Sequence, residues 1–285
     1  MSGNEVLSTR DLLHLAAARL SQAGVDSARL DARILLAQAM GASREELIAG
    51  TRQPTPEQEQ AFQTLIARRA AREPLAYITG SKEVWSLDFK VGPGVLVPRP
   101  ETETLVEASL AALPDRQAPL RIGDLGTGTG ALLLAALAEF PKARGIGFER
   151  SAEALAYARS NLRSLGFEGR GEIIAADWND ARDQNFDLIF SNPPYIPSAE
   201  ILTLEPEVRL YEPRAALDGG TDGLDAYRTL AELLPRLLRP GAIAVLELGQ
   251  GQAERVKSLF RNLIVLDVAP DLAGNLRVLV LKASK

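Results

Sequence analysis

The 285-residue sequence contains no cysteine, and this absence excludes disulfide bonds, thiolate metal sites and cysteine nucleophiles. It has a single histidine, His14, which cannot form a multi-histidine metal site and which we expect to be structural. The longest apolar run, Ala131 to Ala138, is too short to cross a bilayer. The N-terminal residues also lack the apolar core of a signal peptide. We therefore predict a soluble, cytoplasmic protein with no metal site and no membrane association.

Basic residues are outnumbered as well. The chain has 32 Lys and Arg against 37 Asp and Glu, which gives a net charge of −5. A strong nucleic-acid binder usually carries a basic excess, so we expect no direct binding of nucleic acid, although a local patch stays compatible with this total. Hydrophobic residues make up 46% of the chain, which at this length is enough for two domains with real cores.

Helical patterns fill the first part of the chain. Ser8, Asp26, Ser43 and Thr55 each precede a stretch with helical periodicity, and their side chains are of the kind that caps helices. The last of these stretches stops before Pro74, because proline disfavours helix in the residue before it. We predict a small helical-bundle domain over residues 1–73.

The pattern changes to extended chain over residues 74–100. Gly92-Pro93-Gly94 is a strong turn signal in this stretch. The residues before it that favour extended backbone are Val84, Trp85, Leu87, Phe89 and Val91. We predict a β-hairpin linker here.

Strands and helices then alternate over residues 101–285. The predicted strands cover residues 120–125, 143–148, 172–176, 186–191, 242–248, 263–268 and 276–281. Such alternation indicates an α/β domain with a doubly wound, mostly parallel sheet of seven strands.

A glycine-rich loop, Asp-Leu-Gly-Thr-Gly-Thr-Gly over residues 124–130, lies where the first of these strands meets its helix. Glycines at such a junction allow a tight turn and a close approach of a ligand to the backbone. With Ala131 the loop also satisfies the dinucleotide pattern, so NAD and S-adenosylmethionine both remain open at this point. Glu149 ends the second strand, where a carboxylate can accept hydrogen bonds from both ribose hydroxyls of either cofactor.

Trp178 follows the third strand, at the place where an adenine base would lie. Its indole can stack on the base. The preceding Asp177 is a weaker candidate for contacting the exocyclic amine, because a strand-end aspartate is often only a cap.

The tetrapeptide Asn192-Pro193-Pro194-Tyr195 comes directly after the fourth strand, at the edge where doubly wound sheets hold ligands. Methyl transfer to a planar nitrogen requires an oriented NH₂ group, because the nitrogen lone pair is delocalised into a carbonyl or ring. The Asn192 side-chain oxygen and the Pro193 carbonyl are suitable acceptors for the two N–H bonds. The prolines stiffen the loop, and Tyr195 can pack against the flat group. The tetrapeptide therefore favours S-adenosylmethionine over NAD.

Two further segments make a resemblance specific: Glu-Pro-Leu-Ala-Tyr-Ile-Thr-Gly at 73–80 and Val-Pro-Arg-Pro-Glu-Thr-Glu at 97–103. With the glycine loop and the tetrapeptide, the sequence resembles the peptide-chain release factor glutamine N5-methyltransferases along essentially its whole length. The resemblance implies a Rossmann-like class I methyltransferase domain preceded by a helical substrate-recognition domain. It also implies methylation of the glutamine in the Gly-Gly-Gln motif of class I release factors, in support of translation termination. The methyl donor would be S-adenosyl-L-methionine and the product S-adenosyl-L-homocysteine.

Site residues follow from the resemblance position by position. The implied catalytic and substrate contacts are Asn192, Pro193, Pro194 and Tyr195. The implied cofactor contacts are Gly126, Thr127, Gly128, Thr129, Gly130, Glu149, Trp178 and Asn192. Glu149 stands where the family more often has aspartate, which lengthens the reach to the ribose but keeps the chemistry. Arg99, Glu101 and Glu103 receive no role, because a solvated helix start explains them equally well.

Three other functions remain open on the residues alone. A nucleic-acid methyltransferase acting on adenine N6 or guanine N2 uses a similar tetrapeptide, but it must also hold phosphates, which the acidic total disfavours. An NAD-dependent oxidoreductase leaves the tetrapeptide unexplained. A non-catalytic adaptor leaves the intact glycine loop, Glu149 and the tetrapeptide without a purpose.

Overall fold

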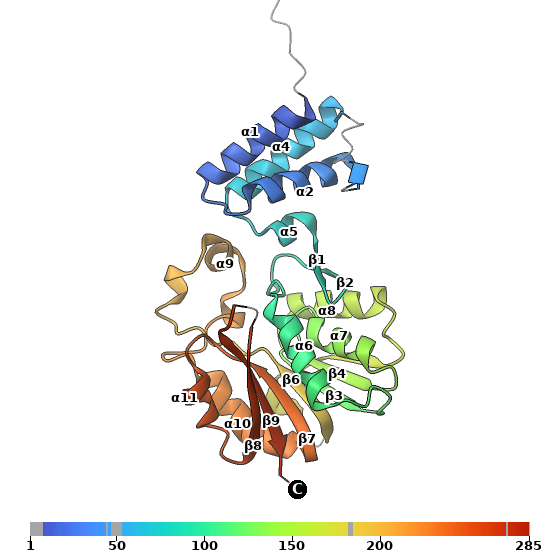
Figure 1. Ribbon diagram of the computed structural model, residues 1–285, viewed down its shortest axis with the longest axis vertical. Helices are drawn as coiled ribbons and strands as arrows, with labels where there is room; N and C mark the ends of the chain where they lie inside the picture. The colour runs from blue at the N-terminus through green and yellow to red at the C-terminus, as the bar shows by residue number, and fades with distance from the viewer. Residues whose placement is uncertain (1–7, 44, 47–52, 182–184, 272, 285) are drawn as a thin grey trace, which may run out of the picture. The chain divides into compact units, whose positions relative to one another are not determined.

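The computed structural model describes residues 8–43, 45–46, 53–181, 185–271 and 273–284. The chain divides into two compact units, shown with their elements in Figure 1. Met1–Gly80 and Glu205–Tyr211 make the smaller unit, and Ser81–Leu204 and Glu212–Lys285 make the larger one. This division differs from the predicted one, because it lies after Gly80 and assigns the hairpin to the larger unit.

The smaller unit is a helical bundle with locally encoded ends. Its helices are α1 (Thr9–Gln22), α2 (Ala28–Met40), α4 (Pro56–Ala70) and the short α5 (Leu75–Thr79). Ser8 accepts a hydrogen bond at the start of α1, and Thr55 and Gln58 form a reciprocal capping box at the start of α4. Asp26 caps nothing, because α2 begins after Ser27. The predicted cap at Ser43 forms its reciprocal bonds with Glu46, but most of the helix beyond it lies outside the described residues.

A segment from far along the chain completes the smaller unit. Helix α9 (Pro206–Tyr211) supplies Glu207, which accepts hydrogen bonds from Arg69 at 2.8 Å and from Arg72 at 2.6 Å. Arg69 is buried and also pairs with the buried Asp31 at 2.7 Å. Removing one member of a largely buried charge network leaves the others uncompensated, so these ion pairs tie α9 to this unit.

The larger unit is built on a seven-stranded sheet with the order β5-β4-β3-β6-β7-β9-β8. Strand β9 runs antiparallel to β7 and β8, and the other neighbouring pairs are parallel. The strands are β3 (Arg121–Leu125), β4 (Arg144–Glu149), β5 (Gly171–Ala175), β6 (Phe186–Ser191), β7 (Leu238–Glu247), β8 (Leu263–Pro270) and β9 (Leu276–Ala283). This confirms the predicted α/β class and the mostly parallel sheet.

Helices cover both faces of this sheet. In Figure 1, α6 (Glu101–Ala112), α7 (Ala131–Glu139) and α8 (Ala152–Ser164) lie over one face, and α10 (Asp225–Leu237) and α11 (Ala253–Lys257) over the other. The apolar side of α10 packs with inward-facing residues of β6 and β7 in one continuous hydrophobic cluster. Among the helices of the described residues, none combines the length and the apolar character that spanning a bilayer would need.

The hairpin consists of β1 (Ser81–Val84) and β2 (Leu87–Lys90), and it turns at Trp85-Ser86. Both turn residues have positive φ angles, 53° and 57°, although neither is glycine. Two hydrogen bonds offset the unfavourable backbone conformation of Trp85. Its backbone N–H donates to Glu103 and its indole N–H donates to Glu139, both at 2.8 Å. Gly92-Pro93-Gly94 therefore lies beyond β2 and does not form the turn of the hairpin.

Candidate active site

The glycine loop and the tetrapeptide begin side by side. They follow β3 and β6, which are neighbouring parallel strands with Asp124 opposite Phe190. The Ser191 hydroxyl at the end of β6 donates to the carbonyl of Leu125 at the end of β3, at 2.8 Å. Both loops thus leave the carboxyl edge of the sheet at adjacent positions, which is where an open α/β sheet binds ligands.

Three glycines give the loop its course. Gly126, Gly128 and Gly130 have φ angles of 79°, 57° and 86°, in the left-handed region where other residues are strained. The N–H groups of Gly126 and Thr127 both donate to the carbonyl of Phe148 on β4, at 3.0 Å. The loop is therefore fixed by its own backbone and by the adjacent strand.

The polar side chains of the loop turn inward. Thr127 and Thr129 are buried, and the Thr127 hydroxyl donates to the Asp124 carboxylate at 2.6 Å. Burial raises the pKa of Asp124 to about 7. The two threonine side chains are consequently buried in the protein, and the backbone groups of Thr127 and the carbonyl of Thr129 are hydrogen-bonded within it.

Glu149 is half-buried at the end of β4 and already holds the loop. One carboxylate oxygen accepts from the N–H of Gly128 at 3.0 Å, and the other accepts from the N–H of Ser151 at 2.8 Å. Each oxygen keeps a further lone pair, so two ribose hydroxyls can still be bound. Its anchoring of the glycine loop was not evident from the sequence.

Trp178 lies beside the loop, at the start of the 3₁₀ turn η1 (Trp178–Asp180). A Cβ added at Gly126 would lie 3.3 Å from the Trp178 indole nitrogen, so glycine is needed where the ring approaches the backbone. Asp177 caps η1, accepting from the N–H of Asn179 at 3.2 Å. The structure thus brings the indole to the loop, while Asp177 has a local structural partner.

The tetrapeptide runs through a narrow passage formed by glycines from the following loop. Pro193 is buried and Asn192 is partly buried. Within the described part of the chain, no residue forms a hydrogen bond with the Asn192 side chain. A Cβ added at Gly219 would lie 2.8 Å from the Pro194 carbonyl oxygen, and one at Gly223 would overlap the Tyr195 carbonyl. The tetrapeptide backbone is therefore held on its outer side, while the Asn192 amide stays available.

Tyr195 is fixed at both ends by residues that sequence reasoning missed. Its hydroxyl donates to Glu247 at 3.0 Å, and its carbonyl accepts from the Gln252 side chain at 2.9 Å. Burial raises the pKa of Glu247 to about 7, and burial also raises the pKa of the Tyr195 phenol. The available signal was a carboxylate directly after the apolar run Ala-Ile-Ala-Val-Leu over residues 242–246.

The motif at residues 97–103 has structural partners. Arg99 donates to the buried Glu212 at 2.6 Å, and Glu103 accepts from the Trp85 backbone. Glu101 and Arg99 also lie near enough to Glu247 to act on its charge, in opposite directions. These contacts place the motif close to the tetrapeptide end of the site.

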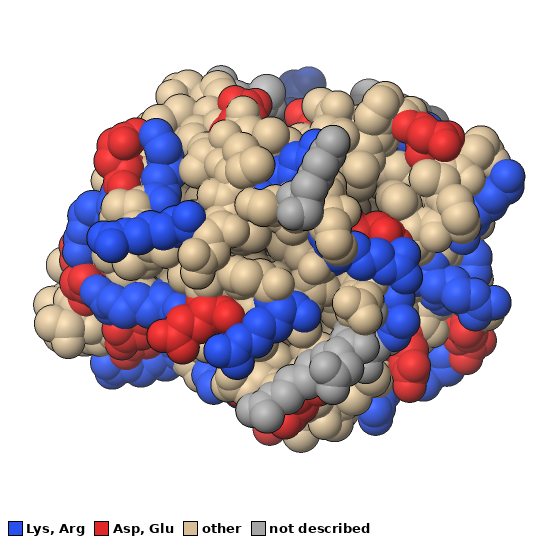
Figure 2. All heavy atoms as spheres, turned by 90° about the horizontal axis from the view of Figure 1, so that it is seen from below, with Lys and Arg blue, Asp and Glu red and all other residues tan. Residues whose placement is uncertain are grey.

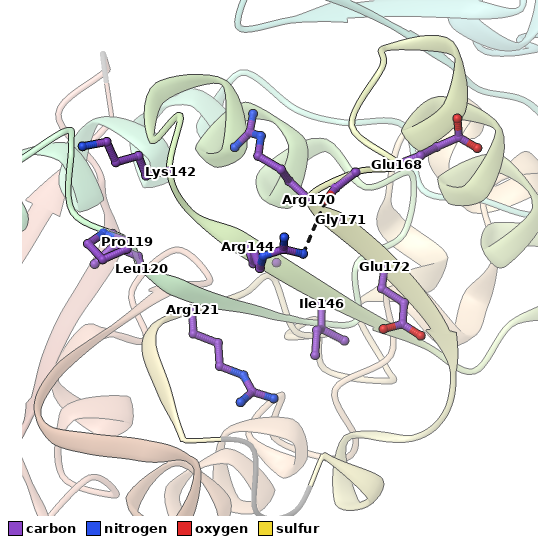
Figure 3. Close-up of a pocket in the computed structure, with 12 residues that line it drawn as sticks. Pro119, Leu120, Arg121, Lys142, Arg144, Ile146, Glu168, Arg170, Gly171 and Glu172 are labelled. Atoms are coloured by element: carbon purple, nitrogen blue, oxygen red, sulfur yellow. Dashed lines mark hydrogen bonds between the residues drawn. The ribbon is translucent and has the colours of Figure 1, made fainter.

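A separate pocket of about 640 Å³ opens at the amino ends of β3, β4 and β5, the opposite edge of the sheet. Figure 3 shows Arg121, Arg144 and Arg170 along it. Arg170 donates to three carbonyls at the end of α7 and its following turn, and Arg144 donates to the Gly169 carbonyl at 3.4 Å. These cations serve the fold, and the pocket contains none of the residues of the two loops.

The chain is similar to known proteins over most of its length. Residues 11–80 match the family described as PrmC N-terminal domain, and residues 118–263 match the family described as Methyltransferase domain. The release factor glutamine methyltransferase of Rhodospirillum rubrum is 47% identical over 94% of this chain and 83% of its own. The protein of the same name from Caulobacter vibrioides is 46% identical over 85% and 84%.

A solved structure shares the fold. A methyltransferase from Pyrococcus furiosus superposes with a TM-score of 0.55 at 19% identity, over 77% of this chain and 99% of that one.

Proposed function

The chain belongs to the release factor glutamine methyltransferases, and we propose that it methylates the glutamine of the Gly-Gly-Gln motif in class I peptide-chain release factors. The methyl group passes from the sulfonium of S-adenosyl-L-methionine to the side-chain amide nitrogen N5. The S–CH₃ bond breaks as the N–CH₃ bond forms, one amide proton goes to water, and S-adenosyl-L-homocysteine remains. The observation that carries the proposal is the adjacency of the two loops at the ends of β3 and β6.

S-adenosylmethionine use is a property of the methyltransferase family, and the residues at the end of β3 fit such a ligand. The backbone of Gly126 to Gly130 passes beside the Trp178 ring, and no atom lies within 4 Å of a Cβ added at Gly128. We assign the ribose hydroxyls to Glu149, the adenine to Trp178, and the remaining contacts to the glycine loop and Asn192. When bound, this group supplies an electrophilic methyl carbon.

The tetrapeptide supplies the acceptors for the substrate amide. The Asn192 side-chain oxygen and the Pro193 carbonyl accept the two N–H bonds, and Tyr195 packs against the flat amide. Orientation of this kind is electrostatic preorganisation, and it acts only if the acceptors are already in place before the substrate arrives. The two prolines and the glycines behind them meet this requirement.

The test is methylation with isotopically labelled S-adenosylmethionine. Release factor, duplex DNA and ribosomal RNA are offered in turn, with a release factor whose Gly-Gly-Gln glutamine is replaced by alanine as the matched control. We expect label in the unmodified release factor alone. Label in either nucleic acid, or in the alanine control, would contradict the proposed substrate. Tight binding of NAD without response to S-adenosylmethionine would contradict the proposed cofactor.

The surface charge also bears on the choice of substrate. In Figure 2, Asp and Glu lie among the Lys and Arg residues of the face seen from below, so this face offers a phosphate backbone no uniformly positive surface.

We further propose that residues 1–73 select the release factor through protein contacts, and that the reaction takes place in the cytoplasm, where translation terminates. Deleting these residues would remove Arg69 and Arg72, the partners of Glu207, so the full chain is needed for the test. Leu15 and Leu30 are apolar side chains of α1 and α2 that are 54% and 49% exposed. Solvent-exposed leucines on a recognition domain are suitable anchors for a protein partner.

Substitution of each leucine by aspartate tests this role. We expect kcat/KM for full-length release factor to fall about fivefold or more, the scale of one interface anchor, with a short Gly-Gly-Gln peptide unaffected. Ile264→Asp on β8, at 51% exposure in the larger unit, is the matched control and should leave both substrates unchanged. Equal losses on protein and peptide would show that the helical unit serves folding instead.

A further inference from the structure

Glu247 is a buried carboxyl that the transfer reaction does not require as a base. It ends β7 with 1% of its surface exposed. One oxygen, Oε1, accepts from the Tyr195 hydroxyl at 3.0 Å, and the other, Oε2, receives no hydrogen bond from the part of the chain that the structure describes. An apolar residue would fill this place without the cost of burying a carboxyl, so the carboxyl calls for a functional explanation.

Tyr195 connects this carboxyl to the acceptors of the substrate amide. Glu247 holds the phenol end of Tyr195, and Gln252 holds its carbonyl. The two residues before Tyr195 are prolines, whose fixed φ angles leave few ways for the chain to absorb a movement. A shift of Tyr195 is therefore passed on to the Pro193 carbonyl and to Asn192.

We propose that Glu247 is a positioning residue for the methyl transfer, which fixes the tetrapeptide through the hydroxyl of Tyr195. The inference rests on the proposed function, because it assigns Glu247 to the glutamine end of that same site. It gives the carboxyl a task that depends on its charge. A carboxylate accepts a markedly stronger hydrogen bond from a phenol than a neutral acid or amide does.

The surroundings of Glu247 make this charge sensitive to pH near neutrality. The pKa of Glu247 is raised to about 7, chiefly by burial and in part by the negative charge of Glu101 on α6. The Tyr195 hydroxyl, Arg277 of β9 and Arg99 act in the opposite direction. Tyr227 of α10 also faces this residue, donating to its backbone carbonyl at 2.8 Å. Glu247 is thus neutral below about pH 7 and charged above it.

The direction of the effect on turnover follows from these charges. Above pH 7 the carboxylate holds the phenol firmly, and below pH 7 the neutral acid holds it less firmly. With both substrates saturating, we expect turnover to rise about fivefold between pH 6 and pH 8, the scale of one hydrogen bond gaining charge assistance. Glu247→Gln keeps the shape and an acceptor but cannot ionise, so its turnover should stay flat at the low-pH level of the natural enzyme.

Two further variants show whether the effect travels through the phenol. Tyr195→Phe should lower turnover to or below the Glu247→Gln level with cofactor affinity unchanged, and Glu247→Gln should add nothing in that background. Tyr227→Phe removes the other buried hydroxyl that contacts Glu247 and is the matched control. It should lower thermal stability while keeping both the turnover and its pH profile, since its hydroxyl bonds the backbone carbonyl of Glu247 and not the carboxyl that holds Tyr195.

The outcomes separate this inference from the proposed function. If the natural enzyme does not methylate release factor, the proposed function fails. If it does, but Glu247→Gln keeps the same pH step, the step belongs to another group such as Asp124 and the positioning role is overturned. Additive effects of Glu247→Gln and Tyr195→Phe on turnover would also overturn it. Calorimetry of cofactor binding by each variant verifies that the site is folded.

Discussion

The glycine loop and the tetrapeptide end neighbouring strands, yet different parts of the chain hold them in place. The loop is fixed by its own backbone, by Phe148 and Glu149 of β4, and by Asn161 of α8, whose side chain donates to the Thr129 carbonyl 32 residues away. The tetrapeptide is fixed from residues 217–223 and 247–252, and Tyr195 bonds to partners 52 and 57 residues away. Residues 126–130 at the cofactor end are therefore held by contacts over shorter stretches of chain than Tyr195 at the amide end.

Asn192→Ala should produce the largest difference between the effect on turnover and the effect on cofactor affinity. Loss of a preorganised acceptor costs on the order of 10²–10³-fold in rate, so turnover should fall by that factor, far more than cofactor affinity falls. Asn192→Asp should also bind cofactor and lose most activity, because it replaces the amide donor by a negative charge. Single-turnover kinetics at saturating cofactor checks both variants. Near-normal turnover in Asn192→Ala would remove the tetrapeptide from the chemistry.

Glu149→Ala should act at the cofactor end alone. We expect cofactor affinity to fall by roughly 1–3 kcal/mol, the scale for losing charge-assisted hydrogen bonds. Part of this loss arises because Gly128 and Ser151 lose their acceptor. Turnover at saturating cofactor should recover most of its natural value. Glu172→Ala, an exposed glutamate on β5, is the control for calorimetry. A lasting loss of turnover would show that the two ends are coupled.

Gly219→Ala tests whether the amide end is held from a distance. The added methyl group meets the backbone of Pro194 and Tyr195 at 2.8–2.9 Å, so the tetrapeptide must move. Overpacking of this kind costs roughly 1–3 kcal/mol in the free energy of unfolding, and we expect turnover to fall while cofactor affinity holds. Gly169→Ala, which meets no atom within 4 Å, is the matched control. Unchanged turnover in Gly219→Ala would mean that Gly219 does not fix the position of the tetrapeptide.

His14→Ala should have the smallest effect. The side chain is exposed on α1, and surface substitutions of this kind usually stay within about 0.5 kcal/mol. Since this is the only histidine, any step in turnover near pH 7 that survives the substitution belongs to another group, and the buried carboxyl of Glu247 is the one we propose. A pH profile of the variant against release factor is the measurement. If the step in turnover disappears in His14→Ala, the step arises from the helical unit and not from the candidate site.

Much of the larger unit could be predicted from its sequence. The strand–helix alternation and the left-handed glycines of the loop depend on residues close to one another in the chain. Short-range signals of this kind survive folding because backbone dihedral preferences and caps act locally. The positions of Glu149 and Trp178 beside the loop follow from strand order, which the α/β pattern constrains.

Two features did not follow from local signals. The hairpin turns at Trp85-Ser86, where Glu103 and Glu139 compensate an unfavourable backbone, and not at the glycines that mark a turn by composition. Helix α9 belongs to the helical unit because Glu207 meets Arg69 and Arg72 there. In each case the deciding partners lie far apart in the chain.

The sequence by itself determined most helices and strands. It also determined the glycine loop after β3 and the tetrapeptide after β6. Only the tertiary structure decided that Tyr195 would be held by Glu247 and Gln252, and that Gly219 and Gly223 would confine the tetrapeptide. The reason is physical: backbone preference is set by a residue and its neighbours, whereas burial and its consequences for charge are set by whichever distant segments the topology brings together.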